Sequence, residues 1–349
     1  MIGRVLVLDE IAGRQVAALV VDGRLEELSV DPVDDTPLPG AIYRAVADRP
    51  VKGQGGIFVK LPQGSGFLRQ ISGVAPGQRL LVQVSGPAEA GKALPVTTRL
   101  LFKSRFAIIT PDAAGLNISR RIKDEDLRAE LAALAEAGMA GASPTLGLIL
   151  RSGCAEAEED AIAEDIAAMR GLAEAVLVDV TGGPELLVEG AGAHELAFRD
   201  WLDPAVDEAD TEAGSFDRHG VTEAVEGLLT SRVGLEGGGH MMLEPTRALV
   251  AVDVNTGPDT SPAASLKVNI AAARDLPRQL RLRGLGGQVV VDFAPMPKRE
   301  RHILDQVMKA AFKAEGETNL AGWTTLGLYE LTRKRDRLPL ADLLDGALG

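Results

Sequence analysis

Two aspartates stand at the ends of two short apolar segments, where their carboxylates could share a metal ion. LVAVDVNTG (249–257) contains Asp253 and Asn255, and GGQVVVDF (286–293) contains Asp292. Both segments are rich in β-branched residues and bounded by glycine, as is typical of buried strands. Two carboxylates that lie close together repel each other, so one must take up a proton or a cation must lie between them.

The chain between these two segments predicts how the aspartates come together. Residues 261–284 begin with Ser and Pro and end with Gly, which are start and stop signals of a helix. We expect Pro277, inside this pattern, to kink the helix or to divide it in two. A strand, a helix and a second strand in this order favour a right-handed crossover with parallel strands. Asp253 and Asp292 would then lie at the same carboxyl edge of one sheet, where open α/β sheets bind ligands.

The chemistry of such a pair suits a hard divalent cation. Mg²⁺ uses one or two carboxylates, keeps several waters and bridges phosphate oxygens. Asn255 follows Asp253 by two residues and so points to the same face of its strand, where it could hold a carboxylate or a water of the metal shell. The alternative interpretation is that each aspartate caps the helix that follows it.

Length, hydropathy and cysteine content set the broad class of protein. A chain of 349 residues predicts two or three domains. No apolar run approaches the roughly 20 residues of a membrane span, and the first residues lack the apolar segment of a signal peptide. Cys154 is the only cysteine. It excludes an internal disulfide and a zinc site made of cysteines alone, and it fits a reducing cytoplasm.

The distribution of charge is more informative than its sum. The net charge of −13 argues at first against a nucleic-acid partner. The acidic residues gather at 156–165 and 202–212, however, whereas residues 274–301 carry seven basic side chains against three acidic ones. A basic face on an acidic protein can still bind phosphates. Aromatic residues make up 3% of the chain, so extensive base stacking is excluded.

Three separate blocks of this sequence resemble the catalytic part of the ribonuclease E/G family. They are TRALVAVDVNTG, NIAAARDLPRQLRLRGLGGQVVVDFAPM and GLYELTRKR. The resemblance implies that Asp253 and Asp292 are catalytic and hold Mg²⁺, with Mn²⁺ as an alternative, and that Asn255 positions one of them. It also implies that the metal activates a water for cleavage of single-stranded RNA.

The fold class that we predict is mixed α/β (α+β) with several subdomains. Strands separated by glycine turns dominate the first hundred residues, and helices alternate with strands after them. The resemblance implies four parts: a discontinuous ribonuclease H-like subdomain (1–35 with 195–228), an S1-like OB barrel (36–98), a 5′-sensor-like α/β region (99–194) and a DNase I-like catalytic α/β subdomain (229–349).

The barrel segment provides the first candidate RNA contacts. Short strands at regular spacing with Gly and Pro turns predict a small closed barrel, and IFVKLPQGSGFL (57–68) resembles the S1 version of it. By this resemblance Phe58 and Phe67 would be stacking platforms, and Lys92 would contact the RNA backbone. The alternative is that both phenylalanines fill the barrel.

Residues 99–194 provide a candidate pocket for the 5′ end of the RNA. RLLFKSRFAIITP predicts a pair of strands, TLGLIL predicts one more, and VLVDVTGGPELLVEG (176–190) predicts a β-hairpin after a helix that ends near 173. The resemblance implies that Arg151 and Ser152 bind a 5′-monophosphate. A further arginine of the family has no match here, since Asn319 stands nearest, so the 5′-end preference stays open. The alternative for Arg151 is an ordinary salt bridge.

Basic side chains around the second aspartate are candidates for gripping the RNA backbone, an unspecific and salt-sensitive role. They are Arg278, Arg281, Lys298, Arg299, Arg333 and Lys334.

Taken together, the sequence predicts a cytoplasmic Mg²⁺-dependent endoribonuclease of RNA processing, including rRNA processing, and decay. It would hydrolyse single-stranded RNA to 5′-phosphate and 3′-hydroxyl ends. The family normally continues into a Cys-x-x-Cys zinc link between two subunits; we expect no zinc here, and homo-oligomerisation stays open. Two rivals are an RNA-binding protein of the same fold with little or no turnover, and a metal phosphohydrolase of small phosphoesters.

Overall fold

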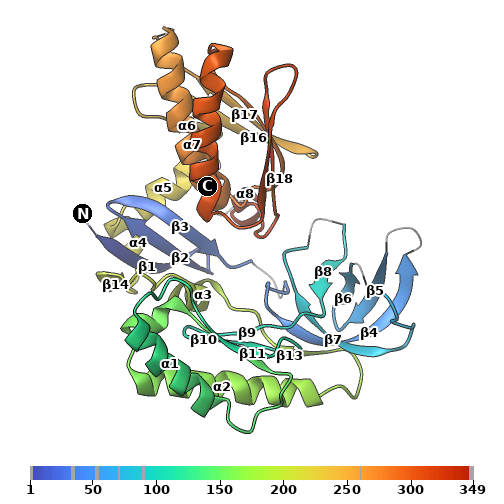
Figure 1. The fold of residues 1–349 in the computed structure, drawn as a ribbon. Helices are drawn as coiled ribbons and strands as arrows, with labels where there is room; N and C mark the ends of the chain where they lie inside the picture. The colour runs from blue at the N-terminus through green and yellow to red at the C-terminus, as the bar shows by residue number, and fades with distance from the viewer. Residues whose placement is uncertain are drawn as a thin grey trace. The chain divides into compact units, whose positions relative to one another are not determined.

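The computed structural model describes residues 3–32, 36–51, 55–69, 71–88, 91–259 and 261–345. The chain forms two compact units, one of Met1–Gly3, Val7–Pro32 and Asp210–Gly349 and the other of Arg4–Leu6 and Val33–Ala209. Both units combine helices with strands (Figure 1), so the predicted mixed α/β class is confirmed. No helix in the described part of the chain is both long enough and apolar enough to cross a membrane.

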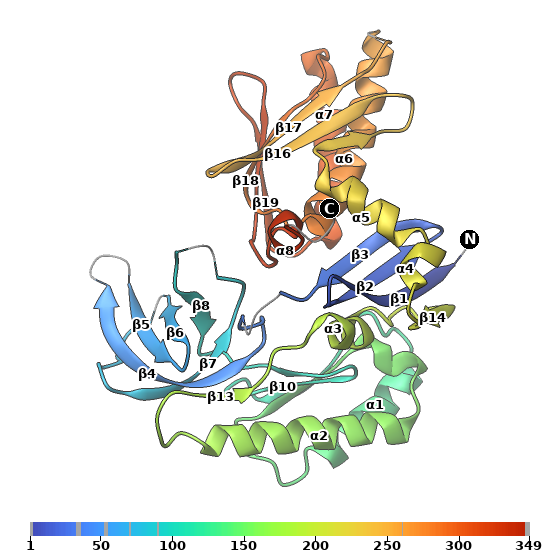
Figure 2. The same cartoon turned by 180° about the vertical axis from the view of Figure 1, so that it is seen from behind.

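A six-stranded sheet forms the centre of the first unit. Its strand order is β15-β16-β17-β18-β20-β19. The strands are β15 (Arg232–Gly234), β16 (His240–Pro245), β17 (Leu249–Asn255), β18 (Gly287–Asp292), β19 (Thr318–Trp323) and β20 (Tyr329–Arg333). Helices α6 (Pro262–Leu282) and α7 (Arg301–Ala311) lie together on one face of the sheet, as Figure 2 shows, and the core lies between them and the strands.

Helix α6 is continuous across Pro277, so the division in two that we considered does not occur. The hydroxyl of Ser261 caps its first turn and accepts a hydrogen bond from the Ala264 N–H at 3.2 Å. Leu276 and Leu280 are buried against the sheet. This packing on either side of the proline offsets the roughly 3 kcal/mol that a proline costs inside a helix.

The N-terminal strands form a second sheet and contact α6. We expected two or three strands in residues 1–35; three occur here, and the sheet order is β14-β1-β2-β3. The strands are β1 (Arg4–Ile11), β2 (Arg14–Val21), β3 (Arg24–Val30) and β14 (Glu208–Asp210). Arg278 on α6 donates to the Leu25 carbonyl at 2.6 Å, and Asp275 pairs with Arg24. The short helices α4 (Ser215–Arg218), α5 (Val221–Leu229) and α8 (Leu340–Leu343) complete this unit.

The second unit contains the predicted closed barrel. The strands follow the order β4-β5-β6-β8-β7, and β7 pairs back with β4 to close it. They are β4 (Ile42–Val51), β5 (Gly56–Leu61), β6 (Gly64–Leu68), β7 (Arg79–Val84) and β8 (Leu94–Thr97). The β6–β8 pair is parallel and the others are antiparallel. Five strands closed in this order are consistent with an OB-like fold.

The rest of this unit is a small sheet covered by helices. Its order is β11-β12-β10-β9, and the predicted strand pair and single strand are confirmed. The elements are β9 (Phe102–Lys103), β10 (Ala107–Thr110), β11 (Gly115–Ile118), α1 (Glu125–Gly138), β12 (Gly147–Leu150), α2 (Glu159–Val178), β13 (Glu185–Val188) and α3 (Ala193–Asp200). Cys154 is buried in this core, and burial raises the pKa of its thiol to about 11.

The predicted hairpin at 176–190 is wrong. Helix α2 continues to Val178, because Ala173 and Val176 pack into the core with Ile162. Tertiary packing thus overrides the strand propensity of a β-branched run. Only the second half of the segment is a strand, β13, and it pairs with β4 of the barrel.

Candidate active site

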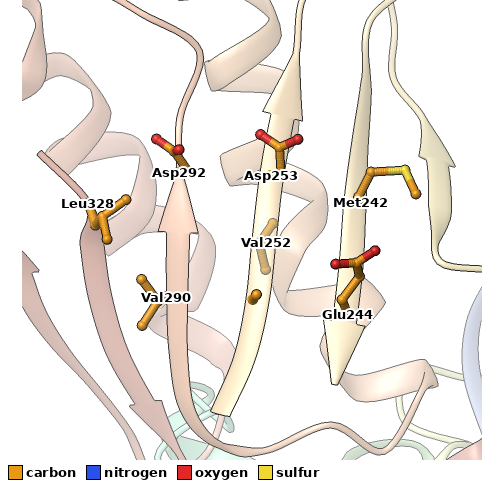
Figure 3. Close-up of a pocket in the computed structure, with 8 residues that line it drawn as sticks. Met242, Glu244, Val252, Asp253, Val290, Asp292 and Leu328 are labelled. Atoms are coloured by element: carbon orange, nitrogen blue, oxygen red, sulfur yellow. The ribbon is translucent and has the colours of Figure 1, made fainter. Parts of the chain in front are cut away.

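Asp253 and Asp292 are direct register partners in the parallel pair β17–β18. Figure 3 shows the two carboxylates at the same level of the two strands. Since neighbouring strands lie about 4.8 Å apart, the two side chains leave the sheet from adjacent positions. Both are exposed. The predicted parallel pairing and the shared sheet edge are therefore confirmed.

Strand alternation explains why these two side chains face solvent. Val252, Val254 and Val291 belong to the core under α6 and α7. Because successive side chains of a strand point to opposite faces, the aspartates beside them must point away from that core. The alternative capping role is wrong: Ser261 caps α6, and the turn after Asp292 has Pro297 at its N-cap position.

Asn255 lies against the first aspartate. Its side-chain amide donates to a carboxylate oxygen of Asp253 at 2.8 Å. The backbone turns just after it at Gly257, whose φ is +78° and where a Cβ would lie 2.6 Å from the Gly238 carbonyl oxygen. The amide therefore fixes the orientation of the Asp253 carboxylate and leaves its other oxygen for a cation.

A buried asparagine holds the chain just beyond the second aspartate. Asn269 of α6 is fully buried; its amide donates to the Ala294 carbonyl at 2.9 Å and its carbonyl accepts from the Ala294 N–H at 2.9 Å. This two-bond clamp ties the turn after Asp292 to the helix. The sequence analysis missed Asn269, because only its position on the buried face of α6 reveals the contact.

The two aspartates line a pocket of about 210 Å³ on the exposed face of the sheet (Figure 3). Its other lining residues are Met242, Glu244, Ala251, Val252, Val290 and Leu328. Glu244 is a third acidic residue that the sequence analysis did not identify. The lining contains no lysine or arginine, so three carboxylates share this pocket without a basic neighbour in its wall.

The donor set fits a hard cation that keeps much of its water. Mg²⁺ needs only one or two protein carboxylates beside its waters and substrate phosphates. A structural zinc site needs four ligands, usually Cys or His. In the described ranges no three His, Cys, Asp or Glu side chains are grouped to hold a metal. Asp253 and Asp292 could thus hold Mg²⁺ or Mn²⁺, and the oxygen donors do not favour zinc.

Phe58 and Phe67 lie side by side on the outside of the barrel. They are register partners on β5 and β6, with ring centroids 5.2 Å apart. Both are partly exposed, whereas Ile57 and Val59 point inward and fill the core. The alternative in which both phenylalanines fill the barrel is therefore wrong. Lys92 is exposed two residues before β8.

Arg151 and Ser152 already have partners inside the second unit. Arg151 pairs with Asp200 at 2.7 Å and donates to the Ser104 carbonyl at 2.6 Å. The Ser152 hydroxyl donates to Asp203. Burial alone would raise the pKa of Asp200, but hydrogen bonds from Arg199 and Lys103 hold it below its ordinary value, so Asp200 stays charged. Arg151 thus forms the salt bridge of the alternative interpretation, and its role toward a 5′-phosphate stays a prediction.

Four of the six basic candidates also have internal partners. Arg278 and Arg281 bind the N-terminal strands, at 2.6 Å to the Leu25 carbonyl and 2.7 Å to Glu27. Arg333 is buried and donates to the Leu285 carbonyl at 3.2 Å, and Lys334 pairs with Glu317 at 2.8 Å. Lys298 and Arg299, in the short turn η2 (Lys298–Glu300), are exposed and make no side-chain bond to any described residue.

The sequence of this chain matches a known protein family. The sequence profile of the Ribonuclease E/G family matches residues 102–212 and 205–336. Ribonuclease E of Nostoc sp. is 30% identical over 92% of this chain, and ribonuclease E of Synechocystis sp. is 30% identical over 94%. Ribonuclease G of Haemophilus influenzae is 28% identical over 94% of the chain and 78% of its own length.

The matches cover both units, although the chain spans only 54% and 56% of the two ribonucleases E. The profile includes β17, α6 and β18, and with them both aspartates and Asn255. This chain belongs to the ribonuclease E/G family.

Proposed function

We propose that this protein is a cytoplasmic, metal-dependent endoribonuclease that acts on single-stranded RNA in RNA processing and decay. One observation carries the proposal: Asp253 and Asp292 are register partners on an exposed sheet face, in a chain of the ribonuclease E/G family. A small phosphoester would not require the aromatic pair of the barrel, so RNA is the substrate class that uses more of the described surface.

The residues of the site have separate tasks. The carboxylates of Asp253 and Asp292 hold a divalent cation, and Asn255 keeps the Asp253 carboxylate in place. When bound, Mg²⁺ or Mn²⁺ lowers the pKa of water and offsets the charge of the phosphate. Attack by water in line with the leaving oxygen needs no 2′-hydroxyl, so the products carry a 5′-phosphate and a 3′-hydroxyl.

Binding of the RNA would use two kinds of contact. Phe58 and Phe67 offer faces on which bases stack regardless of sequence, and Lys92, Lys298 and Arg299 meet phosphates. A 5′-monophosphate at Arg151 and Ser152 would require Asp200 and Asp203 to give up hydrogen bonds that they now accept.

The family also suggests names for the parts of the chain. We assign residues 1–35 with 195–228 to a ribonuclease H-like subdomain, 36–98 to an S1-like barrel, 99–194 to a 5′-sensor-like region and 229–349 to a DNase I-like catalytic subdomain.

The test is cleavage of a 5′-labelled unstructured oligoribonucleotide by purified protein, with Mg²⁺ or with EDTA, followed by mapping of the ends. Asp253→Asn and Asp292→Asn should each abolish cleavage and leave RNA affinity in EDTA nearly unchanged, because each removes a charged ligand without changing side-chain volume. Asp342→Asn, an exposed aspartate of α8 in the same unit, serves as the control and should cleave normally.

Three results would contradict the proposal in different ways. Normal cleavage by either variant removes the assignment of the site. RNA binding without metal-dependent cleavage at any protein concentration favours an RNA-binding protein with little turnover. Competition by mononucleotides as strong as by oligonucleotide favours a phosphohydrolase of small phosphoesters.

A further inference from the structure

Glu244 lies on β16, the strand beside β17, close to the pair Asp253 and Asp292. Strand β16 runs antiparallel to β17, with Met242 opposite Asp253 and Glu244 opposite Ala251. Residues two apart on a strand share a face, so Glu244 and Asp253 are diagonal neighbours on the exposed face. Such neighbours lie about 7–8 Å apart, within reach of a long side chain. Figure 3 shows Glu244 on the strand next to Asp253, in the wall of the same pocket.

The Glu244 carboxylate has no hydrogen-bond or ion-pair partner in the part of the chain that the structure describes. Some other acidic side chains of the same unit are paired, such as Glu315 with Arg281 and Glu317 with Lys334, whereas Glu330 has no partner among the described residues. An unpaired carboxylate beside two others is unfavourable unless a cation offsets their repulsion. Glu244 is exposed, so water also solvates its carboxylate, but a cation bound between the aspartates would attract this carboxylate as well.

The rest of the pocket wall offers few groups that could orient water. Met242, Ala251, Val290 and Leu328 are apolar, and the amide of Asn255 is already used on Asp253. Mg²⁺ keeps several waters when it binds one or two carboxylates. Each metal-bound water donates hydrogen bonds and therefore needs acceptors. Protein groups just outside the metal ligands usually supply these acceptors and so orient the waters.

We propose that Glu244 is a positioning residue of this site, whose carboxylate accepts hydrogen bonds from waters around a divalent cation held by Asp253 and Asp292. The inference rests on the proposed function and deepens it. The Cα of Glu244 lies opposite Ala251, two residues further from the carboxyl edge of β17 than Asp253. A water molecule can bridge this separation. Its role is to orient the water shell, not to touch the reacting phosphate.

The structure supplies a matched control in Glu330. This glutamate of β20 is also exposed and without a described partner, and it lies opposite Val290 on the same face. It is thus the diagonal neighbour of Asp292, as Glu244 is of Asp253, but it does not line the pocket. The two glutamates differ in their access to the pocket and carry the same charge.

The experiment measures cation binding by the 349-residue chain without RNA, with free Mn²⁺ detected by electron paramagnetic resonance and Mg²⁺ followed by calorimetry. Glu244→Gln should weaken binding about ten-fold or more, as loss of a group around a metal shell typically does. Glu330→Gln should bind as the unchanged protein does. Glu244→Asp, which keeps the charge but shortens the side chain, should recover only part of the loss. The cleavage lost by Glu244→Gln should return at high Mg²⁺.

The outcomes separate this inference from the proposed function. If Glu244→Gln binds Mn²⁺ normally while Asp253→Asn does not, the role of Glu244 is overturned and the aspartate site stands. Equal losses in Glu244→Gln and Glu330→Gln, or full recovery in Glu244→Asp, would indicate a general effect of charge and would also overturn it. Normal binding by both Glu244→Gln and Asp253→Asn would remove the proposed function itself. Far-ultraviolet circular dichroism checks that each variant is folded.

Discussion

The exposed face of the β16–β17–β18–β20 sheet and the outer face of the β5–β6 pair are built in the same way but display opposite chemistry. In each, alternate residues of neighbouring strands fill a core and the residues between them face outward. The first displays carboxylates without basic neighbours in the pocket wall. The second displays two phenylalanine rings in contact. Under the proposed function, the cation site belongs to the first face and base stacking to the second.

The carboxylates of the sheet face and the aromatic rings of the barrel should interact with RNA in different ways. Carboxylates repel a phosphate backbone, so the sheet face can hold RNA only when a cation is present. Stacking on aromatic rings needs no metal and accepts any base. Under the proposed function, stacking on the barrel therefore persists in EDTA, whereas cation binding without RNA reports the sheet. The two measurements allow the faces to be tested separately.

The largest effect after loss of the aspartates should come from the aromatic pair. Phe58→Ala and Phe67→Ala should each cost about 1–3 kcal/mol of RNA affinity, because each ring removed leaves one base without a stacking partner. Fluorescence anisotropy in EDTA measures the loss. Phe198→Ala is the control, since this phenylalanine of α3 is 41% exposed and lies outside the barrel.

The same variants test the division between the faces. At saturating RNA, cleavage by Phe58→Ala should approach the normal maximal rate. A lower maximal rate with unchanged affinity would show that the barrel contributes to the chemical step, and the division would then be wrong.

A smaller effect is expected from Asn255→Ala. Loss of the 2.8 Å hydrogen bond frees the Asp253 carboxylate to rotate. Removal of such a supporting group typically lowers metal affinity or activity about 10–100-fold. RNA affinity in EDTA should not change. Asn117→Ala, an exposed amide on β11, is the control. Weaker RNA binding by Asn255→Ala in EDTA would contradict the separation of the two faces.

The smallest effect on function should follow from Asp275→Asn, which acts behind the sheet. Burial alone would raise the pKa of Asp275, but Arg278 and Arg24 lower it below its ordinary value of 3.8. The folded state thus favours the charged carboxylate. Its contribution to stability is present above the unfolded-state pKa and is lost as pH falls through the lower folded-state pKa.

Urea denaturation measures this contribution. At neutral pH the substitution should lower the free energy of unfolding by about 1.5–3 kcal/mol, the range of hydrogen bonds to charged groups. The difference between Asp275→Asn and the unchanged protein should shrink as pH falls below about 4. RNA affinity per folded molecule should stay the same; a weaker affinity would show that α6 contacts RNA after all.

These contrasts also explain what the sequence could predict. The β17–α6–β18 unit was predictable because its signals are local: β-branched runs, a Ser-Pro start and glycine ends. The shared sheet edge of Asp253 and Asp292 followed from the parallel crossover, whereas their direct register is known only from the structure. Glu244 could not be found in this way, because its position depends on the antiparallel pairing of β16 with β17, which fixes the face that each side chain occupies.

The basic residues show a second limit. Sequence reveals that Arg278 and Arg281 lie in a basic stretch, but not that Leu25 and Glu27 lie against them. Those partners are about 250 residues away along the chain and come into contact only in the folded unit. The hairpin expected at 176–190 failed for a similar reason, since core packing extended α2 through a run with strand propensity.

The buried Cys154 has a practical consequence. Its thiol is 1% exposed, and its pKa of about 11 leaves almost no thiolate at neutral pH. Because the thiolate is the species that reacts with maleimides and disulfide reagents, the native chain should be silent toward them. A single cysteine introduced on either outward face can then carry a fluorophore without a background signal. Such a label would show whether RNA binds at the barrel and cations at the sheet, and how fast each binds.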